Sequence, residues 1–302
     1  MVAYLFAGQG AQYIGMGKDL YESFPESKAV FDKADKVLGF SISKLCFEGP
    51  QEELTKTKNC QPAIVAASIA ALEAYKAQGT SDKAQVKFVA GLSLGEYSAL
   101  VAAGAISFED AIYLVRRRGE YMEEEALKNP GKMASLIGLD LSKVKEVCAK
   151  TNTEIANINC PGQIVISGSP SGIEEAVKLA KEIGARMAII LDVSGAFHSS
   201  FMKGATLKLA KELDSVKINA PRIPVISNVS GKPVASAFEI EENLIKQVAS
   251  SVLWEDSMKF ILNSGVSKFI EFGPGKVLKG LMRRIDVNAE VKTVEKKADI
   301  IV

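Results

Sequence analysis

Strand-like apolar runs alternate with helical patterns over the first third of the chain. The run "VAYLFAGQG" opens as a short buried strand that enters a glycine-rich turn, and "KFVAG" at 87–91 has the same form. Apolar residues recur at helical spacing over 18–38, 61–78 and 95–104, between and after these strands. Strands that alternate with helices predict a parallel α/β sheet.

Residues 132–192 follow a different order of elements. Strand patterns occur in "KMASLIGL", "TEIANINC", "QIVISG" and "ARMAIILDV", and helical patterns in "LSKVKEVCAK" and "PSGIEEAVKLAKEIG". The order is βαββαβ, which is ferredoxin-like. We therefore interpret 131–197 as a subdomain inserted into an α/β core made of 1–130 and 198–302. In that core, "PVISNV" and "KFIEFG" add strands and "GKVLKGLMRR" adds a helix.

Length and charge narrow the classes of function. The 302 residues are 47% hydrophobic, which is enough for one large core with a smaller one beside it. The 37 Lys and Arg against 36 Asp and Glu leave a formal net charge of +1, which argues against nucleic acid as the main ligand. The longest apolar stretch, Pro62 to Tyr75, contains Glu73 and is too short to span a bilayer, so we expect no membrane role.

The cysteines indicate a reducing compartment. None of the four falls in a C-x-x-C or Cys/His spacing typical of a metal site, and no charged-then-apolar signal segment follows Met1. We expect a cytoplasmic protein, a monomer, that uses neither a metal nor a tightly bound cofactor. The four cysteines are Cys46, Cys60, Cys148 and Cys160.

A serine stands between two glycines where the strand pattern at 87–91 gives way to a helical one. Gly91 to Gly95 read "GLSLG", a G-x-S-x-G sequence. A strand that turns sharply at Ser93 would expose the hydroxyl at the carboxyl edge of the sheet, at the N-terminus of the next helix. Such a short pattern also arises by chance, but its position between a strand and a helix favours a functional serine.

The chain contains one histidine, His198, just after the last strand of the predicted insert. Histidine is the usual base for a serine nucleophile because its pKa lies near neutrality. A lone histidine is more often a surface or core residue without a catalytic role. The pairing with Ser93 reverses that preference, because no other histidine could serve.

Three arginines follow an apolar stripe in "FEDAIYLVRRRGEYM". Arg118 follows Leu114 by four residues and precedes Met122 by four, so it lies on the buried face of a helix, whereas at least one of Arg116 and Arg117 should reach solvent. A buried guanidinium requires a partner. That partner is either an internal carboxylate, in a structural salt bridge, or the carboxylate of a ligand.

Two glycine-rich turns resemble phosphate loops only in part. "AGQGAQ" lacks the third glycine of a dinucleotide site, because position 13 is Tyr, and "GPGKVL" has no Ser or Thr after Lys276. The first turn can instead aim the Gln9 amide into a site. An oxyanion hole needs two such amides, and the second would come from Leu94, directly after the nucleophile.

Seven motifs occur in the order of the malonyl-CoA:acyl carrier protein transacylase family and cover nearly the whole chain. They are "GQGAQ", "GLSLGEYSAL", "RRRG", "NCPGQIVISG", "GAFHSSFM", "PVISNV" and "EFGPGKVLKGL". The resemblance implies an α/β-hydrolase-like core with a ferredoxin-like insert. It also implies a ping-pong transfer of a malonyl group from malonyl-CoA to acyl carrier protein, in fatty acid or polyketide synthesis.

Six positions carry the family's site residues by this resemblance. It implies a nucleophile, its base, an arginine for the malonyl carboxylate, two oxyanion amides, and a backbone carbonyl that orients the base. In that order, these are Ser93, His198, Arg118, Gln9 with Leu94, and Gln247. The site would then be a Ser-His dyad rather than a triad completed by an acid.

The chain departs from the family pattern at two positions. Leu92 stands where the family more often has His. The sequence "AFH" at 196–198 resembles the version associated with malonyl selection, but the residue before it is Gly195, where His is commoner in the family. The dyad needs neither histidine. These departures therefore concern acyl selectivity and leave the predicted chemistry unchanged.

The sequence leaves two other functions open. A serine hydrolase would use the same elbow and an acid between Ser93 and His198, for which Asp140 and Asp192 are available. A non-catalytic scaffold would have a disrupted dyad.

The docking surface for the carrier protein is also open. Acyl carrier proteins are acidic, and "GKVLKGLMRR" offers a basic face that could bind one but equally suits a helix exposed to solvent. Its cations are Lys276, Lys279, Arg283 and Arg284.

Overall fold

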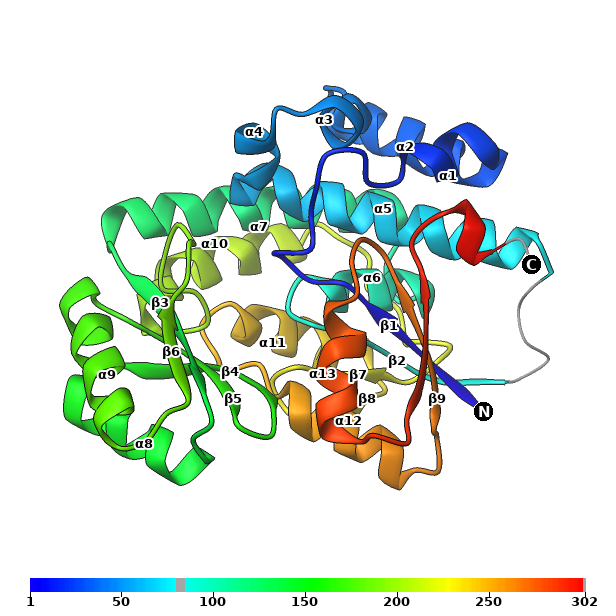
Figure 1. The fold of residues 1–302 in the computed structure, drawn as a ribbon. Coiled ribbons are helices and arrows are strands. Elements are labelled where there is room, and N and C mark those ends of the chain that lie inside the picture. Colours follow the sequence, from blue (N-terminus) through cyan, green and yellow to red (C-terminus); the bar gives the residue numbers. More distant parts are fainter. Residues whose placement is uncertain (80–84, 301–302) are drawn as a thin grey trace.

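The computed structural model describes residues 1–79 and 85–300 and contains two separate sheets (Figure 1). The strands of the larger sheet are β1 Val2–Phe6, β2 Val86–Gly91, β7 Val225–Ile226, β8 Pro233–Val234, β9 Lys268–Phe272 and β10 Glu290–Val294. They lie in the order β10-β9-β1-β2-β7-β8, and all pairs are parallel except β7 with β8. The predicted parallel α/β sheet is confirmed.

Helices cover both faces of this sheet. Because side chains alternate along a strand, Tyr4 and Phe6 of β1 pack into one apolar cluster, and Ala3 and Leu5 pack into another. The first cluster includes α5 Thr57–Ala77, α6 Gly95–Ala102 and α7 Phe108–Lys128, and the second includes α12 Trp254–Asn263 and α13 Val277–Ile285. The other core helices are α1 Lys18–Ser23, α2 Pro25–Leu38, α3 Ile42–Glu48, α4 Gln51–Thr55, α10 Lys203–Leu213 and α11 Ala237–Gln247.

Prolines occur in two of the predicted helices, and only one of them interrupts its helix. The single helix expected over 18–38 is wrong: the chain is extended at Phe24, and Pro25 begins a second helix, because proline disfavours the helical conformation of the residue before it. In contrast, Pro62 lies inside α5, which begins at Thr57. Proline cannot donate to the carbonyl four residues earlier, and that carbonyl, of Lys58, accepts from Arg116 Nη1 instead at 3.2 Å.

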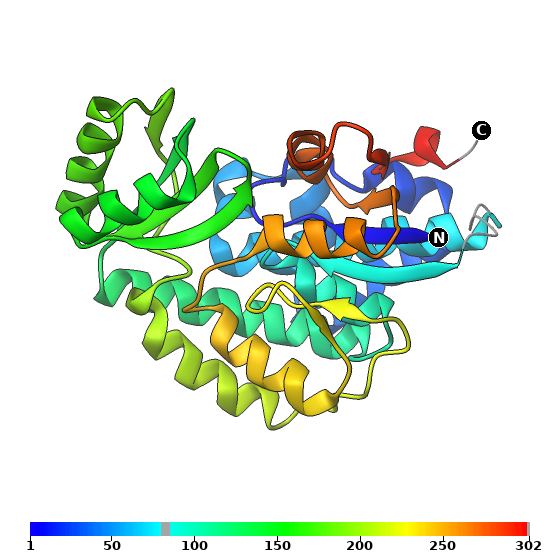
Figure 2. The same ribbon diagram turned by 90° about the horizontal axis from the view of Figure 1, so that it is seen from below.

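The second sheet forms the predicted insert. Its elements are β3 Lys132–Ile137, α8 Leu141–Thr151, β4 Glu154–Cys160, β5 Gln163–Gly168, α9 Pro170–Glu182 and β6 Met187–Ile190. The antiparallel order β4-β5-β3-β6 confirms the ferredoxin-like βαββαβ prediction. This unit has its own apolar cluster and lies at the end of the molecule away from the N-terminus in both views (Figures 1 and 2).

The parallel register brings two glycine-rich turns together. Phe6 at the end of β1 pairs with Gly91 at the end of β2, so the turn that contains Gln9 and the turn that contains Ser93 leave the same edge of the sheet. Within the described residues, no helix is long and apolar enough to cross a membrane. Nor do the His, Cys, Asp and Glu side chains of these residues form a group of three or more that could hold a metal.

Candidate active site

Ser93 lies on a sharp turn that only a glycine at each side allows. Its φ is 51°, in the left-handed region that residues with a side chain rarely adopt. A Cβ on Gly91 would lie 2.0 Å from the backbone of Gly95, and a Cβ on Gly95 would lie 2.2 Å from the carbonyl oxygen of Phe6. The two glycines therefore let β1, β2 and α6 approach closely enough to hold the serine at the sheet edge.

The single histidine faces this serine. His198 Nε2 lies 2.8 Å from Ser93 Oγ, and His198 Nδ1 lies 2.9 Å from the backbone carbonyl of Gln247. The carbonyl can only accept, so Nδ1 carries the proton and Nε2 accepts from the serine hydroxyl. Burial and the nearby Arg118 cation lower the pKa of the imidazole to about 4, so the ring is neutral near pH 7.

Both acids considered for a hydrolase triad lie away from this histidine nitrogen. Asp140 accepts the amide of Lys143 as the N-cap of α8. Asp192 lines the cavity described below, but the Nδ1 of His198 is bonded to a carbonyl rather than to a carboxylate. The geometry is that of a dyad.

Arg118 is buried beside the serine, as its position on the stripe predicts. Only 1% of its surface is exposed. Its Nη1 donates to Gln61 Oε1 at 2.8 Å, and its Nη2 donates to Ser93 Oγ and to Gln247 Oε1, each at 3.1 Å. Within the described residues, no carboxylate oxygen lies within 4.0 Å of the guanidinium, and its Nε has no hydrogen-bond partner. The structure therefore contains no internal salt bridge to Arg118.

Two backbone amides remain available near the nucleophile. The amide of Ser93 donates to Asn228 Oδ1 at 2.6 Å. In contrast, the amides of Gln9 and Leu94 donate to no group among residues 1–79 and 85–300. Gln9 lines the same cavity as Ser93, and Leu94 follows the serine directly. These are the two amides that the sequence assigns to an oxyanion hole.

A cavity of about 730 Å³ opens onto Gln9, Ser93 and His198 and is lined by residues of both sheets and their turns. In contrast, Leu94, Arg118 and Gln247 are buried and are not among its lining residues. The larger sheet and its turns contribute Gln9 and Ser93, and His198 lies just after the insert. The insert contributes Met133, Asn157 and Val165, among others. The cavity is large enough for an extended acyl thioester arm.

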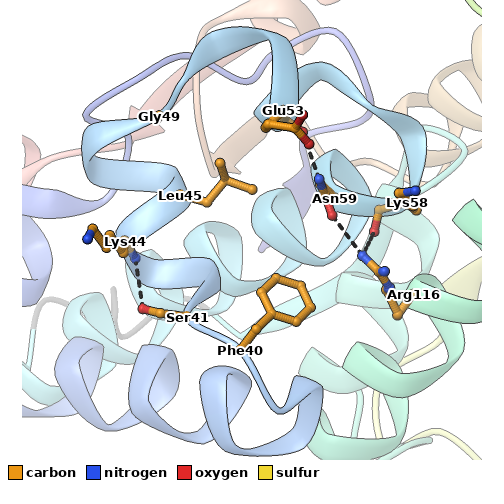
Figure 3. Close-up of a pocket in the computed structure, with 9 residues that line it drawn as sticks. All are labelled: Phe40, Ser41, Lys44, Leu45, Gly49, Glu53, Lys58, Asn59 and Arg116. Carbon is orange, nitrogen blue, oxygen red and sulfur yellow. Dashed lines mark hydrogen bonds between the residues drawn. The ribbon is translucent and has the colours of Figure 1, made fainter.

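A second hollow, of about 530 Å³, is lined by residues of α3, α4, α5 and α7 and contains none of the predicted site residues (Figure 3). Arg116 donates there to the Lys58 carbonyl and to Asn59 Oδ1. Arg116 and Arg117 have side chains 23% and 37% exposed, as their helical positions predict. The hollow is lined by Phe40, Ser41, Lys44, Leu45, Gly49, Glu53, Lys58, Asn59 and Arg116.

Comparison with known proteins decides the family. Residues 3–295 match the family model described as the acyl transferase domain. The chain belongs to this acyl transferase family. The predicted family is confirmed.

Three named proteins resemble this acyl transferase over nearly their whole length. The malonyl CoA-acyl carrier protein transacylase of Bacillus subtilis (strain 168) is 51% identical over 298 residues, 97% of this chain and 92% of the relative. The acyl-carrier-protein-S-malonyltransferase from Bartonella henselae has a TM-score of 0.96 at 42% identity, over 99% and 96% of the two chains. A malonyl-transacylase solved in complex with a type II PKS acyl-carrier protein has a TM-score of 0.94 at 38% identity, over 99% and 97%.

The two departures from the family pattern have clear positions in this acyl transferase. Leu92 lines the cavity, and its carbonyl oxygen would lie 2.5 Å from a Cβ on Gly8. Gly195 packs so closely on α7 that a Cβ there would lie 2.6 Å from the Cβ of Ala126. A side chain at 195 would therefore require a shift of the chain there or of Ala126.

Sequence reasoning missed three polar residues of the acyl transferase site. Gln61 precedes the proline in α5, Glu96 follows the elbow glycine, and Asn228 lies two residues after the end of β7. Two of these positions, Glu96 and Asn228, carried a weak signal, and Gln61 carried none. Glu96 is a carboxylate at the start of an otherwise apolar helix, and Asn228 lies at the carboxyl end of a parallel strand, where ligand-binding residues gather.

Proposed function

We propose that this chain transfers a malonyl group from malonyl-CoA to the phosphopantetheine thiol of acyl carrier protein, through an ester on Ser93. The observation that carries the proposal concerns one oxygen atom. Ser93 Oγ lies 2.8 Å from the neutral base His198 and 3.1 Å from the buried cation Arg118. A nucleophile, its base and a carboxylate-binding group therefore meet at a single point, which fits the malonyl transfer named in its relatives.

The first half-reaction acylates the serine. His198 Nε2 takes the hydroxyl proton as Ser93 Oγ attacks the thioester carbonyl carbon. The amides of Gln9 and Leu94 receive the oxyanion, and each donor is worth about 3 kcal/mol of barrier. The carbon–sulfur bond then breaks, the imidazolium returns the proton to the departing coenzyme A sulfur, and malonyl-Ser93 remains.

Arg118 supplies the grip on the free carboxylate of the malonyl group. Both hydrogens of its Nη2 already meet acceptors, Ser93 Oγ and Gln247 Oε1, whereas Nε donates to no described group. A carboxylate bound in bidentate fashion to the Nε/Nη2 edge would satisfy Nε and take one Nη2 hydrogen from its present acceptor. Gln61 would keep its bond to Nη1. This fit favours an acyl group that bears a carboxylate over acetyl.

The second half-reaction repeats the chemistry with a thiol. His198 accepts the proton of the phosphopantetheine thiol, the sulfur attacks the ester carbonyl, and Ser93 Oγ leaves with that proton. The route is ping-pong, with a shared acyl-enzyme. The structure solved with a type II PKS acyl-carrier protein supports this class of partner.

We infer that α13 contributes to the docking of the acidic carrier protein. Its buried side holds Leu281, which lines the cavity together with Val277, while its cations face solvent. Within the described residues, none of these cations is in an ion pair with an acidic side chain. A basic face at the wall of the cavity suits a negatively charged partner whose arm enters there. The cations are Lys276, Lys279, Arg283 and Arg284.

Several finer assignments are inferences from the sequence. We infer a core of 1–130 and 198–302 and an insert of 131–197, with the substrate arm held between them. The cytoplasmic location, the monomeric state and the lack of a nucleic-acid partner stay predictions from composition and charge.

An isotope exchange tests the ping-pong proposal without the carrier protein. The purified chain is incubated with malonyl-CoA and labelled coenzyme A alone. We expect label to appear in malonyl-CoA, because the acyl-enzyme reacts back with the free thiol. Net release of malonate without exchange would contradict the transferase and favour the thioesterase. The variant Ser93→Ala should show neither reaction.

A further inference from the structure

A buried carboxylate lies behind the nucleophile and has no part in the chemistry described so far. Glu96 is in the first turn of α6, three residues after Ser93, and is 3% exposed. Its Oε2 accepts from the backbone amide of Asn228 at 3.1 Å and from Gln247 Nε2 at 2.7 Å. Burying a carboxylate is costly, so its retention at this position requires an explanation.

Gln247 connects this carboxylate to both working groups of the site. Its backbone carbonyl accepts from His198 Nδ1, and its side-chain Oε1 accepts from Arg118 Nη2. Its Nε2 donates to the carbonyl of Ser93 at 3.0 Å and to Glu96. One glutamine therefore contacts the nucleophile, the base, the arginine and the carboxylate.

The carboxylate fixes the direction of the glutamine amide. The two groups that face Nε2, the Ser93 carbonyl and the ionised carboxylate of Glu96, can only accept hydrogen bonds. The donor end of the amide must therefore point toward them, which leaves Oε1 toward Arg118. An inverted amide would place an NH2 group against the guanidinium, with both groups donors.

We propose that Glu96 is a positioning residue that acts through Gln247 on Arg118 and His198 and balances the buried charge of the arginine. The proposal rests on the proposed function, because it assumes that Arg118 binds the malonyl carboxylate and that His198 is the base. Glu96 would thus have a role like that of the acid in a Ser-His-acid triad, but it would act on the histidine through Gln247. It contacts Gln247 rather than the histidine itself.

Charge supports the same assignment. Burial and the Arg118 cation both lower the pKa of His198, so the arginine opposes the imidazolium that forms when Ser93 is deprotonated. Glu96 is the buried carboxylate of the network, and its charge offsets that of the arginine. The other titratable groups near Glu96 are His198, reached through Gln247, and Tyr97, the next residue on α6. The ionised form of Glu96 should therefore be the active one.

Burial raises the pKa of the Glu96 carboxyl to about 7, so the carboxyl changes charge at pH values near neutrality. Below that pH the protonated carboxyl accepts more weakly from Gln247, and Arg118 loses its counter-charge. The acylation rate should then fall as the pH drops through about 7. His198 contributes its own fall only near its lower pKa of about 4.

The test measures single-turnover malonylation of Ser93 from malonyl-CoA between pH 5.5 and 8.5. The variant Glu96→Gln keeps the shape of the side chain and removes the charge. At pH 8 we expect its saturating rate constant to fall about 10- to 100-fold, with a half-saturating concentration within about threefold of wild type. Its rate constant should not show the fall that we expect for wild type as the pH drops through about 7, here called the step near pH 7. At pH 5.5 wild type and variant should therefore approach the same rate.

The control variant is Glu271→Gln. Glu271 is also fully buried, and burial also raises its pKa to about 7, but its oxygens accept the backbone amides of Leu278 and Lys279 and do not contact Gln247. We expect this variant to keep the step near pH 7. A role of Glu96 in folding alone would lower the fraction of active enzyme and leave the rate constant and the step unchanged, and that result would overturn the proposal.

The two proposals fail in different ways. If wild-type Ser93 acquires no malonyl group, the proposed function is wrong. If wild type is malonylated and Glu96→Gln reproduces its rate constant and its pH profile, only the role of Glu96 is wrong. Loss of the step in both Glu96→Gln and Glu271→Gln would also contradict the assignment to Glu96.

Discussion

At the scale of single residues, the site depends on polar groups that must lie within hydrogen-bond distance of one oxygen. Ser93 was predictable from its two glycines, His198 because it has no competitor, and Arg118 from its helical spacing. The contacts of Gln61 and Gln247 were not, because they join residues 57 and 129 positions from Arg118. A lone amide side chain gives no periodic signal, so only the fold reveals such a partner.

Arg118→Lys should cost more with malonyl-CoA than with acetyl-CoA. A lysine keeps the charge but cannot bind a carboxylate at two points or satisfy Gln61 and Gln247 together. We expect the rate of Ser93 malonylation to fall about 10- to 100-fold, and the malonyl-to-acetyl ratio to fall with it. Rapid quench followed by peptide mass analysis measures both. An unchanged ratio would contradict the carboxylate-binding role.

At the scale of elements, pattern predicted the kind of structure better than its interruptions. The βαββαβ order and the early strands were predictable, because strand and helix periods differ. The break at Pro25 was missed, although proline itself signals it, and the helices α10, α11 and α12 were not predicted. As a result, the sequence placed Gln247 only by resemblance, without the helix that ends at it.

Reversal of charge on α13 should separate the two half-reactions. In the double variant Lys279→Glu, Arg283→Glu, we expect malonylation of Ser93 by malonyl-CoA to stay within about twofold of wild type. Transfer to acyl carrier protein should fall at least tenfold at low salt, and the difference should shrink as ionic strength rises. Equal losses in both half-reactions would indicate damage to the cavity wall rather than to a docking surface.

At the scale of the whole molecule, the active site depends on a cavity that is lined by residues from both sheets and their turns. The sequence predicted both units and the position of the insert between Arg118 and His198. It also placed the substrate between these units, but it could not predict which side chains line the cavity, because the lining depends on how β4, β5 and α13 approach the carboxyl ends of β1 and β2. Such packing is set by many side chains jointly rather than by any local pattern.

Stability should depend on pH through the buried carboxyl of Glu271. Its pKa is about 7 in the folded protein, against an ordinary value of 4.5, so between these values the folded state binds more protons than the unfolded state. The free energy of unfolding therefore decreases as pH rises through this window. Relative to Glu271→Gln, wild type should lose on the order of 3 kcal/mol between pH 4.5 and 8.

Urea unfolding of both proteins at several pH values measures this difference. Glu96 and His198 also titrate differently in the folded state, but they are common to both proteins and cancel in the comparison. A difference that does not change with pH would contradict a titrating carboxyl at position 271.

The most direct test of the central claim is the mass of the protein after incubation with malonyl-CoA, before and after addition of acyl carrier protein that bears its phosphopantetheine arm. We expect a malonyl adduct on the peptide that contains Ser93, little adduct from acetyl-CoA, and passage of the adduct to the carrier. An adduct lost to water without transfer would support a thioesterase. The lack of any adduct from either thioester would contradict the enzyme and favour a scaffold.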